Sequence, residues 1–434
     1  MTDISNFQQR RQQLLHRMGA GVAVIPTAAE AVRNRDSHYP YRFDSYFYYL
    51  SGFNEPESVL FLIAGAQPKT ILFCRDKDLE REIWDGFRHG PDGAKAFFGV
   101  DEAYSISRLD ELAPQLLANQ PRLFYALGAD VAWDSRVAAW LNQLRSQVRS
   151  GVSAPPDVAD VRALLDDMRL IKSTEEIATM RSAAEISAGA HRRAMQVSKA
   201  GRMEYEIEAE LLHEFRRHGA QSPAYTSIVA GGVNACVLHY VANNAKLRDG
   251  DLLLIDAGCE LDGYASDITR TFPVNGRFTG PQKDLYELVL AAQAAAIATI
   301  RPGASWNAPH DAALNVLVQG FIDFGLCQGT LQSVLESGDY RRFYMHRTGH
   351  WLGLDVHDAG NYKLGDAWLA LEPGMALTVE PGCYVRPADK VPKHFWDIGI
   401  RIEDDAVVTV SGCEIITHAA PKTVADIEAL MAHD

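Results

Sequence analysis

The sequence predicts two domains, an α/β domain followed by an α+β domain. The chain has 434 residues, more than one hydrophobic core usually organises. Helical and strand-like patterns alternate over its first third, whereas long helices and strand-rich stretches fill the remainder. Between these parts, the Pro-Pro pair of "SGVSAPPDVAD" (150–160) interrupts the periodicity and indicates a linker.

The first domain is assigned to residues 1–172. Apolar residues recur at helical spacing in three of its segments, 4–18, 77–87 and 135–148. Short apolar runs bounded by turn residues predict four strands, 21–26, 58–65, 70–74 and 122–127. No glycine-rich phosphate-binding loop occurs among these elements, so the pattern does not predict a nucleotide site.

The second domain is assigned to residues 173–434. It begins at a capping box, Ser173-Thr174-Glu175-Glu176, which predicts a helix that runs to about residue 199. Ile207, Leu211 and Phe215 mark a second amphipathic helix. A strand-rich stretch follows, then two predicted helices and a strand-rich C-terminal part; the helices cover 281–300 and 305–325.

Composition is that of a soluble globular protein, with 47% hydrophobic and 23% charged residues. The formal net charge of -14 argues against a nucleic-acid or anionic-membrane surface. Six scattered cysteines without a CxxC pair fit a reducing compartment. The N-terminus is polar and amphipathic, and the apolar stretch "LVLAAQAAAIATI" (288–300) is too short to span a bilayer. We therefore expect a cytoplasmic protein without a nucleic-acid or membrane partner.

Two acids stand inside strand patterns of the second domain. Asp256 ends the apolar run "LLLID", and Asp267 opens the alternating run "DITRTF". Carboxylates are rare in such settings unless a partner compensates them. A weak echo follows later in the chain: "ALTVEPG" ends with Glu380, and "GIRIEDD" contains Glu403. Either the strand ends are similar by chance, or a half-domain is duplicated and its two sheets converge on one site.

We expect a histidine-rich segment, "MHRTGHWLGLDVHD", to supply one nitrogen ligand for such a site. It contains three of the chain's 14 histidines, His346, His350 and His357. Four clustered carboxylates cannot all stay ionised in a low-dielectric cavity. Two divalent cations about 3.5–4 Å apart would neutralise them. Oxygen ligands with one imidazole favour Mn²⁺ and similar ions over thiolate-bound zinc.

Strand periodicity adds an arginine to this site. Arg401 and Glu403 share one face of a strand, and the apolar neighbours Ile400 and Ile402 argue against a surface ion pair. We therefore expect Arg401 to orient a bridging carboxylate. Other templates fit less well: "HRTGH" lacks the glutamate of a zincin helix, and no GxSxG motif or catalytic-looking cysteine is present.

These motifs resemble a known family. "HYVANNAKLRDGDLLLIDAGCELDGYASDITRTFPVNGRF", "HWLGLDVHD", "LEPGMALTVEPG" and "GIRIEDD" are similar to segments of the pita-bread metallopeptidases, which have the creatinase/aminopeptidase fold. The similarity is greatest to the bacterial aminopeptidase P group and covers essentially the whole chain. "YPYRFDSYFYYLSGFNEPESVLFL" resembles the non-catalytic N-terminal domain of that group, and "MRLIKSTEEI" resembles the start of its catalytic domain.

The resemblance implies a complete set of site residues. Asp256 and Asp267 would bind one metal, and Asp267, His350, Glu380 and Glu403 would bind the other, so that Asp267 and Glu403 bridge the pair. His239, His346 and His357 would line the substrate cleft. The metal would be Mn²⁺, with Zn²⁺ or Co²⁺ as alternatives.

The resemblance also implies an assembly. Relatives often form dimers or tetramers, and the N-terminal domain would serve oligomerisation and form a wall of the cleft. Trp84 of "REIWDG" matches a position that can reach a neighbouring subunit's cleft; a place in the core of its own domain is the alternative.

The predicted function is that of a metal-dependent aminopeptidase that removes the N-terminal residue from peptides with proline in second position. A hydroxide that bridges two divalent metals would attack the carbonyl, Glu380 would transfer the proton to the proline nitrogen, and His357 would stabilise the gem-diolate. Prolidase, which cleaves only dipeptides, is the nearest alternative, and methionine aminopeptidase is disfavoured by the long N-terminal domain. A non-catalytic pita-bread binding module or a metal-free amidinohydrolase would lack ligands that are all present here.

Overall fold

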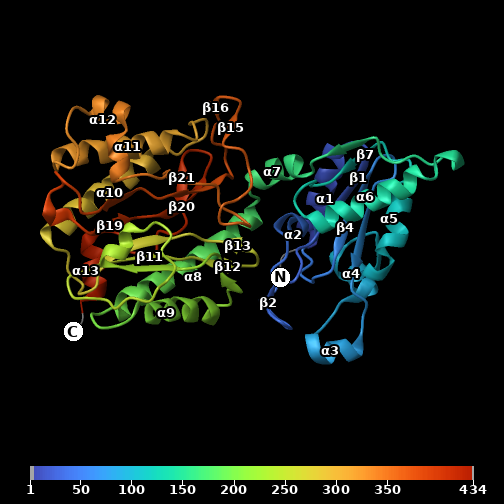
Figure 1. The fold of residues 1–434 in the computed structure, drawn as a ribbon, viewed down its shortest axis with the longest axis horizontal. Helices are drawn as coiled ribbons and strands as arrows, with labels where there is room; N and C mark the ends of the chain where they lie inside the picture. Colours follow the sequence, from blue (N-terminus) through green and yellow to red (C-terminus); the bar gives the residue numbers. More distant parts are fainter. Residues whose placement is uncertain (1–3, 433–434) are drawn as a thin grey trace. The chain divides into compact units, whose positions relative to one another are not determined.

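The computed structural model describes residues 4–432. The chain divides into two compact units, Met1–Met168 and Arg169–Asp434. Each unit has its own hydrophobic core, and Figure 1 shows the elements of both. The predicted boundary, after residue 172, falls close to this division. No helix among residues 4–432 is long and apolar enough to cross a membrane.

Unit 1 is built on one mixed six-stranded sheet with the order β6-β5-β4-β1-β7-β8. Neighbours β1–β4 and β4–β5 are antiparallel, whereas β5–β6, β1–β7 and β7–β8 are parallel. The strands of this sheet are β1 (Gly21–Pro26), β4 (Val59–Ala64), β5 (Lys69–Cys74), β6 (Glu102–Ser105), β7 (Arg122–Phe124) and β8 (Asp157–Ala159). A separate hairpin consists of β2 (Val32–Asn34) and β3 (Ser37–His38).

The helices of unit 1 include the three that the sequence predicts. They are α1 (Ile4–Met18), α2 (Ser45–Ser51), α3 (Leu79–Asp85), α4 (Gly90–Phe98), α5 (Leu109–Leu117) and α6 (Val131–Arg145), with single 3-10 turns at Ile106–Arg108 and Val148–Ser150. Apolar side chains of α5 and α6 pack on the sheet, where Trp140 contacts Phe61.

Two expectations for unit 1 need correction. The stretch 150–160 is not wholly a linker, because it contains β8, which pairs with β7 at the edge of the sheet. The strand predicted over 122–127 ends at Phe124. The connection to unit 2 is instead α7 (Arg162–Leu170).

Unit 2 begins as the capping box predicts. The Ser173 hydroxyl accepts a hydrogen bond from the Glu176 N–H (3.3 Å), and the Glu176 carboxylate accepts one from the Ser173 N–H (2.9 Å). The helix so capped is the longest of the unit, whose helices are α8 (Thr174–Val197), α9 (Glu204–Arg217), α10 (Gly280–Thr299), α11 (Ala308–Asp323), α12 (Leu331–Ser337) and α13 (Val424–Met431). Single 3-10 turns lie at Gly232–Cys236, Asp339–Arg342 and Lys393–Phe395.

The strands of unit 2 form several short antiparallel sheets, among them β10-β11-β14, β17-β20-β21 and β18-β19. These three sheets lie between the helix pair α8–α9 and the helix pair α10–α11 (Figure 1). The strands are β9 (Ser222–Pro223), β10 (Ile228–Gly231), β11 (Leu252–Asp256), β12 (Cys259–Leu261), β13 (Tyr264–Ala265), β14 (Thr269–Pro273), β15 (Lys363–Leu364), β16 (Ala367–Trp368), β17 (Ala376–Val379), β18 (Gly382–Val385), β19 (Ile398–Arg401), β20 (Asp404–Val408) and β21 (Cys413–Ile415).

Two antiparallel strand pairs bring the predicted acids to the same place. In the first pair Asp256 ends β11 opposite Thr269, the first residue of β14. In the second pair Val379 of β17 lies opposite Asp404, the first residue of β20. Since antiparallel partners place the end of one strand beside the start of the other, each pair presents two acids at one end.

Candidate metal centre and substrate cleft

One cavity of about 680 Å³ in unit 2 contains all the predicted site residues in its wall. They come from both strand pairs, from the connection between β10 and β11 and from the histidine-rich segment: His239, Asp256, Asp267, His346, His350, His357, Glu380, Arg401 and Glu403. The two sheets therefore converge on one site, as the duplicated-half alternative requires.

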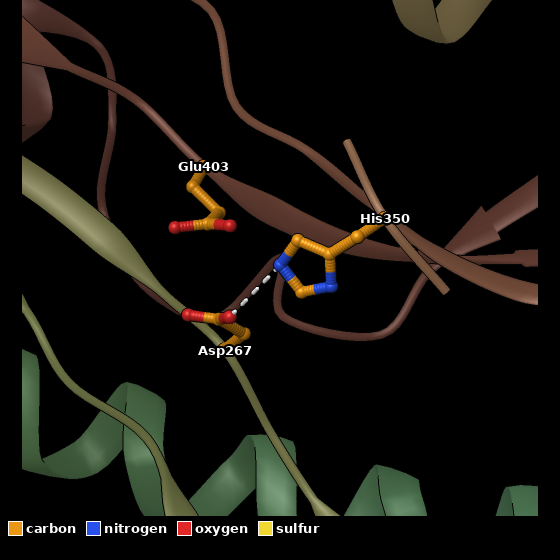
Figure 2. Close-up of side chains that lie close together, drawn as sticks. All are labelled: Asp267, His350 and Glu403. Atoms are coloured by element: carbon orange, nitrogen blue, oxygen red, sulfur yellow. Dashed lines mark ion pairs between the residues drawn. The ribbon is translucent and has the colours of Figure 1, made fainter. Parts of the chain in front are cut away.

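The tightest cluster of potential metal ligands consists of Asp267, His350 and Glu403 (Figure 2). One ligand atom from each lies within 4.8 Å of the other two. His350 Nε2 is 3.5 Å from Asp267 Oδ2 and 3.8 Å from Glu380 Oε1. Glu380 therefore lies beside the cluster. The fifth predicted ligand, Asp256, is connected to Asp267 by the hydroxyl of a tyrosine that contacts both carboxylates.

The imidazole of His350 is oriented by backbone and hydroxyl groups. Its Nδ1 lies 2.9 Å from the Trp351 carbonyl oxygen, so Nδ1 carries the proton and Nε2 faces the carboxylates. The His350 N–H donates to Thr378 Oγ1 (3.1 Å). Burial lowers the pKa of His350, but the hydrogen bond to Asp267 and the charge of Glu380 outweigh it and raise the pKa to about 9.

Tyr225 is a site residue that the sequence analysis missed. Its hydroxyl lies between two carboxylates, 2.6 Å from Asp256 Oδ1 and 2.5 Å from Asp267 Oδ1. Burial and the nearby carboxylates raise the pKa of Tyr225, so the phenol stays protonated and donates. Because Tyr225 lies in the turn between Pro223 and β10, no periodic pattern marks it.

Arg401 is buried in the wall of the cavity, and its contacts differ from the expectation. Its Nη2 donates to Asp256 Oδ2 (2.6 Å), which is not one of the predicted bridging carboxylates. Arg401 reaches Glu403 only indirectly, because Nε donates to Thr269 Oγ1 (3.1 Å) and that hydroxyl donates to Glu403 Oε2 (2.6 Å). A third bond runs from Nη1 to the Tyr384 hydroxyl (3.0 Å).

The carboxylates repel one another in this buried setting. Burial raises the pKa of Asp267, and the charge of Asp256 raises it further. Burial also raises the pKa of Glu380 to about 7, and it raises the pKa of Glu403 well above its ordinary value together with the charge of Asp267. An oxygen-rich set of this kind, with one imidazole nitrogen that would give up its proton on metal binding, fits hard divalent cations.

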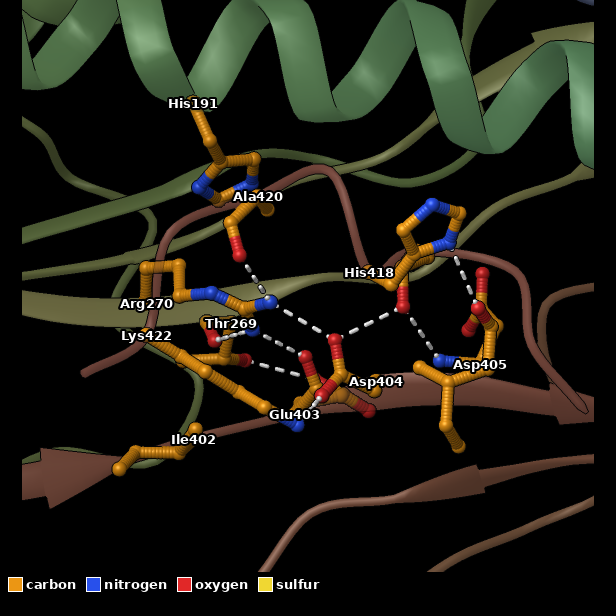
Figure 3. Close-up of polar contacts among 12 residues, drawn as sticks. His191, Thr269, Arg270, Ile402, Glu403, Asp404, Asp405, His418, Ala420 and Lys422 are labelled. Carbon is orange, nitrogen blue, oxygen red and sulfur yellow. Dashed lines mark hydrogen bonds and ion pairs between the residues drawn. The ribbon is translucent and has the colours of Figure 1, made fainter. Parts of the chain in front are cut away.

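A second buried network lies behind Glu403 (Figure 3). Arg270 Nη1 donates to the carbonyl oxygens of Glu403 (2.5 Å) and Thr269 (2.9 Å), and its Nη2 donates to Asp404 Oδ1 (2.7 Å). Lys422 Nζ donates to Asp404 Oδ2 (2.6 Å). This network, also missed by the sequence analysis, fixes the backbone from which Glu403 projects.

The three remaining histidines lie along the cavity. The ring of His357 is 4.3 Å from that of His350, measured between centroids. His346 Nε2 lies 2.9 Å from the Tyr384 hydroxyl, and its Nδ1 is 3.7 Å from Glu380 Oε2. Burial lowers the pKa of His346 to about 3 and also lowers the pKa of His357, so both rings are neutral at pH 7. His239 is exposed to the cavity.

Apolar and aromatic side chains complete the cavity wall and were not predicted. Trp306 and Tyr362 belong to this wall and both pack on the buried Trp351 behind it: the ring of Trp306 is tilted against that of Trp351, and the ring of Tyr362 lies parallel to it with 5.6 Å between centroids. The other members of this wall include Ile228, Leu238, Val241, Val356 and Trp368. Such a surface suits the ring of a proline or another apolar side chain.

Comparison with known proteins agrees with the fold. Residues 178–410 match "Metallopeptidase family M24", and residues 7–125 match "Aminopeptidase P, N-terminal domain". The chain is 46% identical to the Xaa-Pro aminopeptidase of Escherichia coli over 99% of both chains. Among solved structures, Pseudomonas aeruginosa aminopeptidase PepP has a TM-score of 0.98 at 51% identity, covering 99% of this chain and 98% of that one. Zn-substituted E. coli aminopeptidase P in complex with product has a TM-score of 0.97 at 45% identity, with the same coverage.

Fold and site together define a two-domain metallopeptidase. The chain belongs to metallopeptidase family M24 and carries an aminopeptidase P N-terminal domain. The predicted fold class, an α/β N-terminal domain with a pita-bread catalytic domain, is confirmed, and so is the resemblance on which it rested.

Proposed function

We propose that the chain is an Xaa-Pro aminopeptidase, which releases the N-terminal residue from peptides with proline in second position. The observation that carries this proposal is the convergence of four carboxylates and His350 on one cavity with a partly apolar wall. The full-length similarity to proteins named Xaa-Pro aminopeptidase supports it and speaks against the prolidase alternative.

The proposed ligand set is that of a dinuclear centre. Asp256 and Asp267 would bind one ion, and Asp267, His350, Glu380 and Glu403 the other, with Asp267 and Glu403 shared. When bound, two divalent ions polarise the scissile carbonyl and lower the pKa of a water molecule towards neutrality. We propose Mn²⁺ because oxygen ligands predominate, with Zn²⁺ or Co²⁺ as alternatives.

Glu380 is proposed to move the proton of the reaction. Burial raises its pKa to about 7 in the metal-free protein. A carboxylate at this place can accept a proton from the attacking water and release it again. The acceptor is the proline nitrogen, which leaves as a secondary amine. His346 Nδ1 lies 3.7 Å from the same carboxylate.

Histidines of the cleft are proposed to contact the substrate. Neutral His357 is exposed to the cavity beside His350, where one ring N–H can donate to the oxygen that becomes negative during attack. His239 and His346 would line the sites for the flanking residues. Arg401 is proposed to hold Asp256, the carboxylate nearest the substrate α-amine, through its 2.6 Å hydrogen bond.

The apolar wall explains how proline can be favoured. A bond to proline nitrogen is a tertiary amide without an N–H, so a protease cannot hold it by that donor. Recognition must instead come from the ring, for which Ile228, Leu238 and Val241 provide an apolar surface in the cavity.

A homo-oligomer, dimer or tetramer, is part of the proposal. Helix α3 of unit 1 exposes several large apolar side chains, among them Leu79, Ile83 and Trp84, and Trp84 is 83% exposed. Trp84 is therefore not a core residue, and the alternative left from the sequence is contact with a neighbouring subunit's cleft. We also propose a cytoplasmic location, which the six free cysteines support.

Substrate length and sequence test the proposed function. Peptides Xaa-Pro-Yaa should be cleaved with higher kcat/KM than Xaa-Pro dipeptides, because a longer chain makes more contacts along an open cleft. Replacement of proline by alanine should lower kcat/KM strongly. The assay compares all three peptides with the same N-terminal residue at saturating Mn²⁺.

Each outcome of this comparison separates one alternative. Faster cleavage of the dipeptide would make the protein a prolidase. Equal cleavage of the alanine peptide would remove the proline specificity. No cleavage of any of these peptides by a metal-saturated protein would leave the binding module as the better hypothesis.

A further inference from the structure

The segment from His350 to Asp358 carries two histidines of the site and is closed by its own backbone. The Asp358 N–H donates to the Trp351 carbonyl (2.9 Å), and the Gly353 N–H donates to the Asp355 carbonyl (3.1 Å). The Trp351 carbonyl also accepts from His350 Nδ1 (2.9 Å). One carbonyl oxygen thus connects the far end of the loop to the ring orientation of His350.

The Asp358 side chain is buried between two cations. Its Oδ1 accepts from Arg169 Nη2 (2.6 Å) and its Oδ2 from Lys172 Nζ (3.0 Å). The three side chains are 1–2% exposed. Oδ1 also accepts from the Asp355 N–H (3.2 Å). Two buried cations and one backbone donor therefore fix the position of a single carboxylate.

A glycine makes the close approach of this carboxylate feasible. A Cβ atom at Gly353 would lie 2.3 Å from Asp358 Oδ2 and 3.0 Å from Lys172 Cε. Both distances are shorter than ordinary contacts, so a side chain at 353 would displace the ion pair. The turn after Trp351 therefore packs directly against the ion pair.

Both cations belong to the motif "MRLIKSTEEI", which contributes no residue to the proposed catalytic site. Arg169 lies in the last turn of α7, and Lys172 follows that helix just before α8. The Lys172 N–H donates to the Gly374 carbonyl (2.9 Å), two residues before β17, the strand that leads to Glu380. The motif is thus tied to two segments of the site.

We propose that Asp358, held by Arg169 and Lys172, is a positioning residue that fixes the loop 350–358 for metal binding and turnover. Through the Trp351 carbonyl it keeps His350 Nε2 directed at the carboxylates, and through the chain it keeps the adjacent His357 facing the cavity. This inference rests on the proposed function, since it gives His350 and His357 the roles described above.

The test is Asp358→Ala, examined by two independent measurements. Calorimetric titration of the metal-free protein with Mn²⁺ should show about 10–100-fold weaker binding, the usual loss when a group that orients a ligand is removed. At saturating Mn²⁺ and well below the melting temperature, kcat on an Xaa-Pro-Yaa peptide should also fall about 10–100-fold. KM should change little, because Asp358 does not touch the cavity.

Two variants serve as matched controls. Asp355→Asn removes the other acid that pairs with Arg169 (2.7 Å) in the same loop, but it leaves the Asp358 carboxylate in place. Glu55→Gln removes a buried charge from an ion pair with Arg75 in unit 1. Both should keep kcat and Mn²⁺ affinity near those of the wild type, even where they lower the melting temperature.

A folded Asp358→Ala protein with wild-type Mn²⁺ affinity and kcat would overturn the proposal, as would equal losses in the two controls. If that variant does not fold, Asp358→Asn replaces it. The asparagine keeps the size of the side chain but directs an amide donor at one of the two cations. The same losses of Mn²⁺ affinity and kcat are expected, and wild-type values of both would again overturn the proposal. A wild-type protein that binds Mn²⁺ but cleaves no Xaa-Pro peptide would refute the proposed function alone, while the binding measurement would still decide the role of Asp358.

Discussion

Replacing Glu380 by glutamine should eliminate turnover and remove a loss of stability that the metal-free protein undergoes as the pH rises to neutrality. Burial raises the pKa of Glu380 from 4.5 to about 7 in the folded state. A carboxyl group with a raised pKa binds its proton more tightly in the folded state, so its contribution to stability is lost as the pH rises. The loss begins near the unfolded value, about pH 4.5, and is complete above about pH 7.

The gap between these two pKa values corresponds to about 3 kcal/mol of unfolding free energy, at 1.36 kcal/mol for each pH unit. Glutamine carries no proton that titrates in this range, so Glu380→Gln escapes the loss. Replacement also removes the 3.8 Å contact with His350, which shifts the absolute stability of the variant. The quantity to compare is therefore the change with pH of the stability difference between variant and wild type.

Urea unfolding of chelator-treated protein at pH values from 5 to 8, followed by tryptophan fluorescence, measures this difference. The variant should gain up to about 3 kcal/mol over the wild type across this range. Glu372→Gln, at an exposed position in the same segment, is the control and should show no such trend. A stability difference that stays constant from pH 5 to 8 would refute the electrostatic reasoning for Glu380.

Three further predictions concern the metals and the cleft. Exhaustive chelation should abolish peptidase activity and Mn²⁺ should restore it; full activity of demonstrably metal-free protein would contradict the metal requirement. Added Mn²⁺ at 100 times its dissociation constant should stabilise the fold by about 2.7 kcal/mol, measured as a rise in melting temperature. His357→Ala should lower kcat about 10²–10³-fold with metal content near that of the wild type, and loss of both metals in this variant would instead make His357 a ligand. Tyr225→Phe removes the hydroxyl between Asp256 and Asp267. It should lower the melting temperature of the metal-free protein more than that of the Mn²⁺-saturated protein. Equal changes in the two forms would show that the hydroxyl does not compensate the acids.

The sequence predicted those parts of the site in which a polar residue breaks an apolar pattern. Asp256 and Glu380 stand at the ends of buried strands, where an acid is conspicuous, and the capping box at Ser173 specifies a helix start by local chemistry. The sequence around Tyr225 contains no such break in a pattern, because tyrosine is a common residue in a turn and no strand or helix periodicity covers this position. Arg270 was equally hidden, because it occupies one position in an alternating strand pattern and four of its five acceptors come from distant segments.

Elements without their own apolar pattern were also beyond sequence reasoning. The strand β8 (Asp157–Ala159) lies in a proline-containing stretch and joins the sheet only through backbone pairing with β7. Periodicity cannot report such pairing, because two of the three side chains in β8 are exposed. The same limit explains why 122–127 was predicted too long: Leu127 is apolar but 61% exposed, and the pairing ends at Phe124.

The arrangement of charges around the cavity links metal binding to folding. Of the two arginines in the cavity wall, only Arg401 is buried, and its carboxylate partner is Asp256. The pKa values of Asp267, Glu380 and Glu403 are raised, because burial removes these carboxylates from water and the nearby cationic groups do not fully compensate for the lost hydration. Strand pairing thus places the acids together at an electrostatic cost that the fold alone does not offset. Divalent ions would offset it, so metal affinity and stability should change together in every variant of these acids.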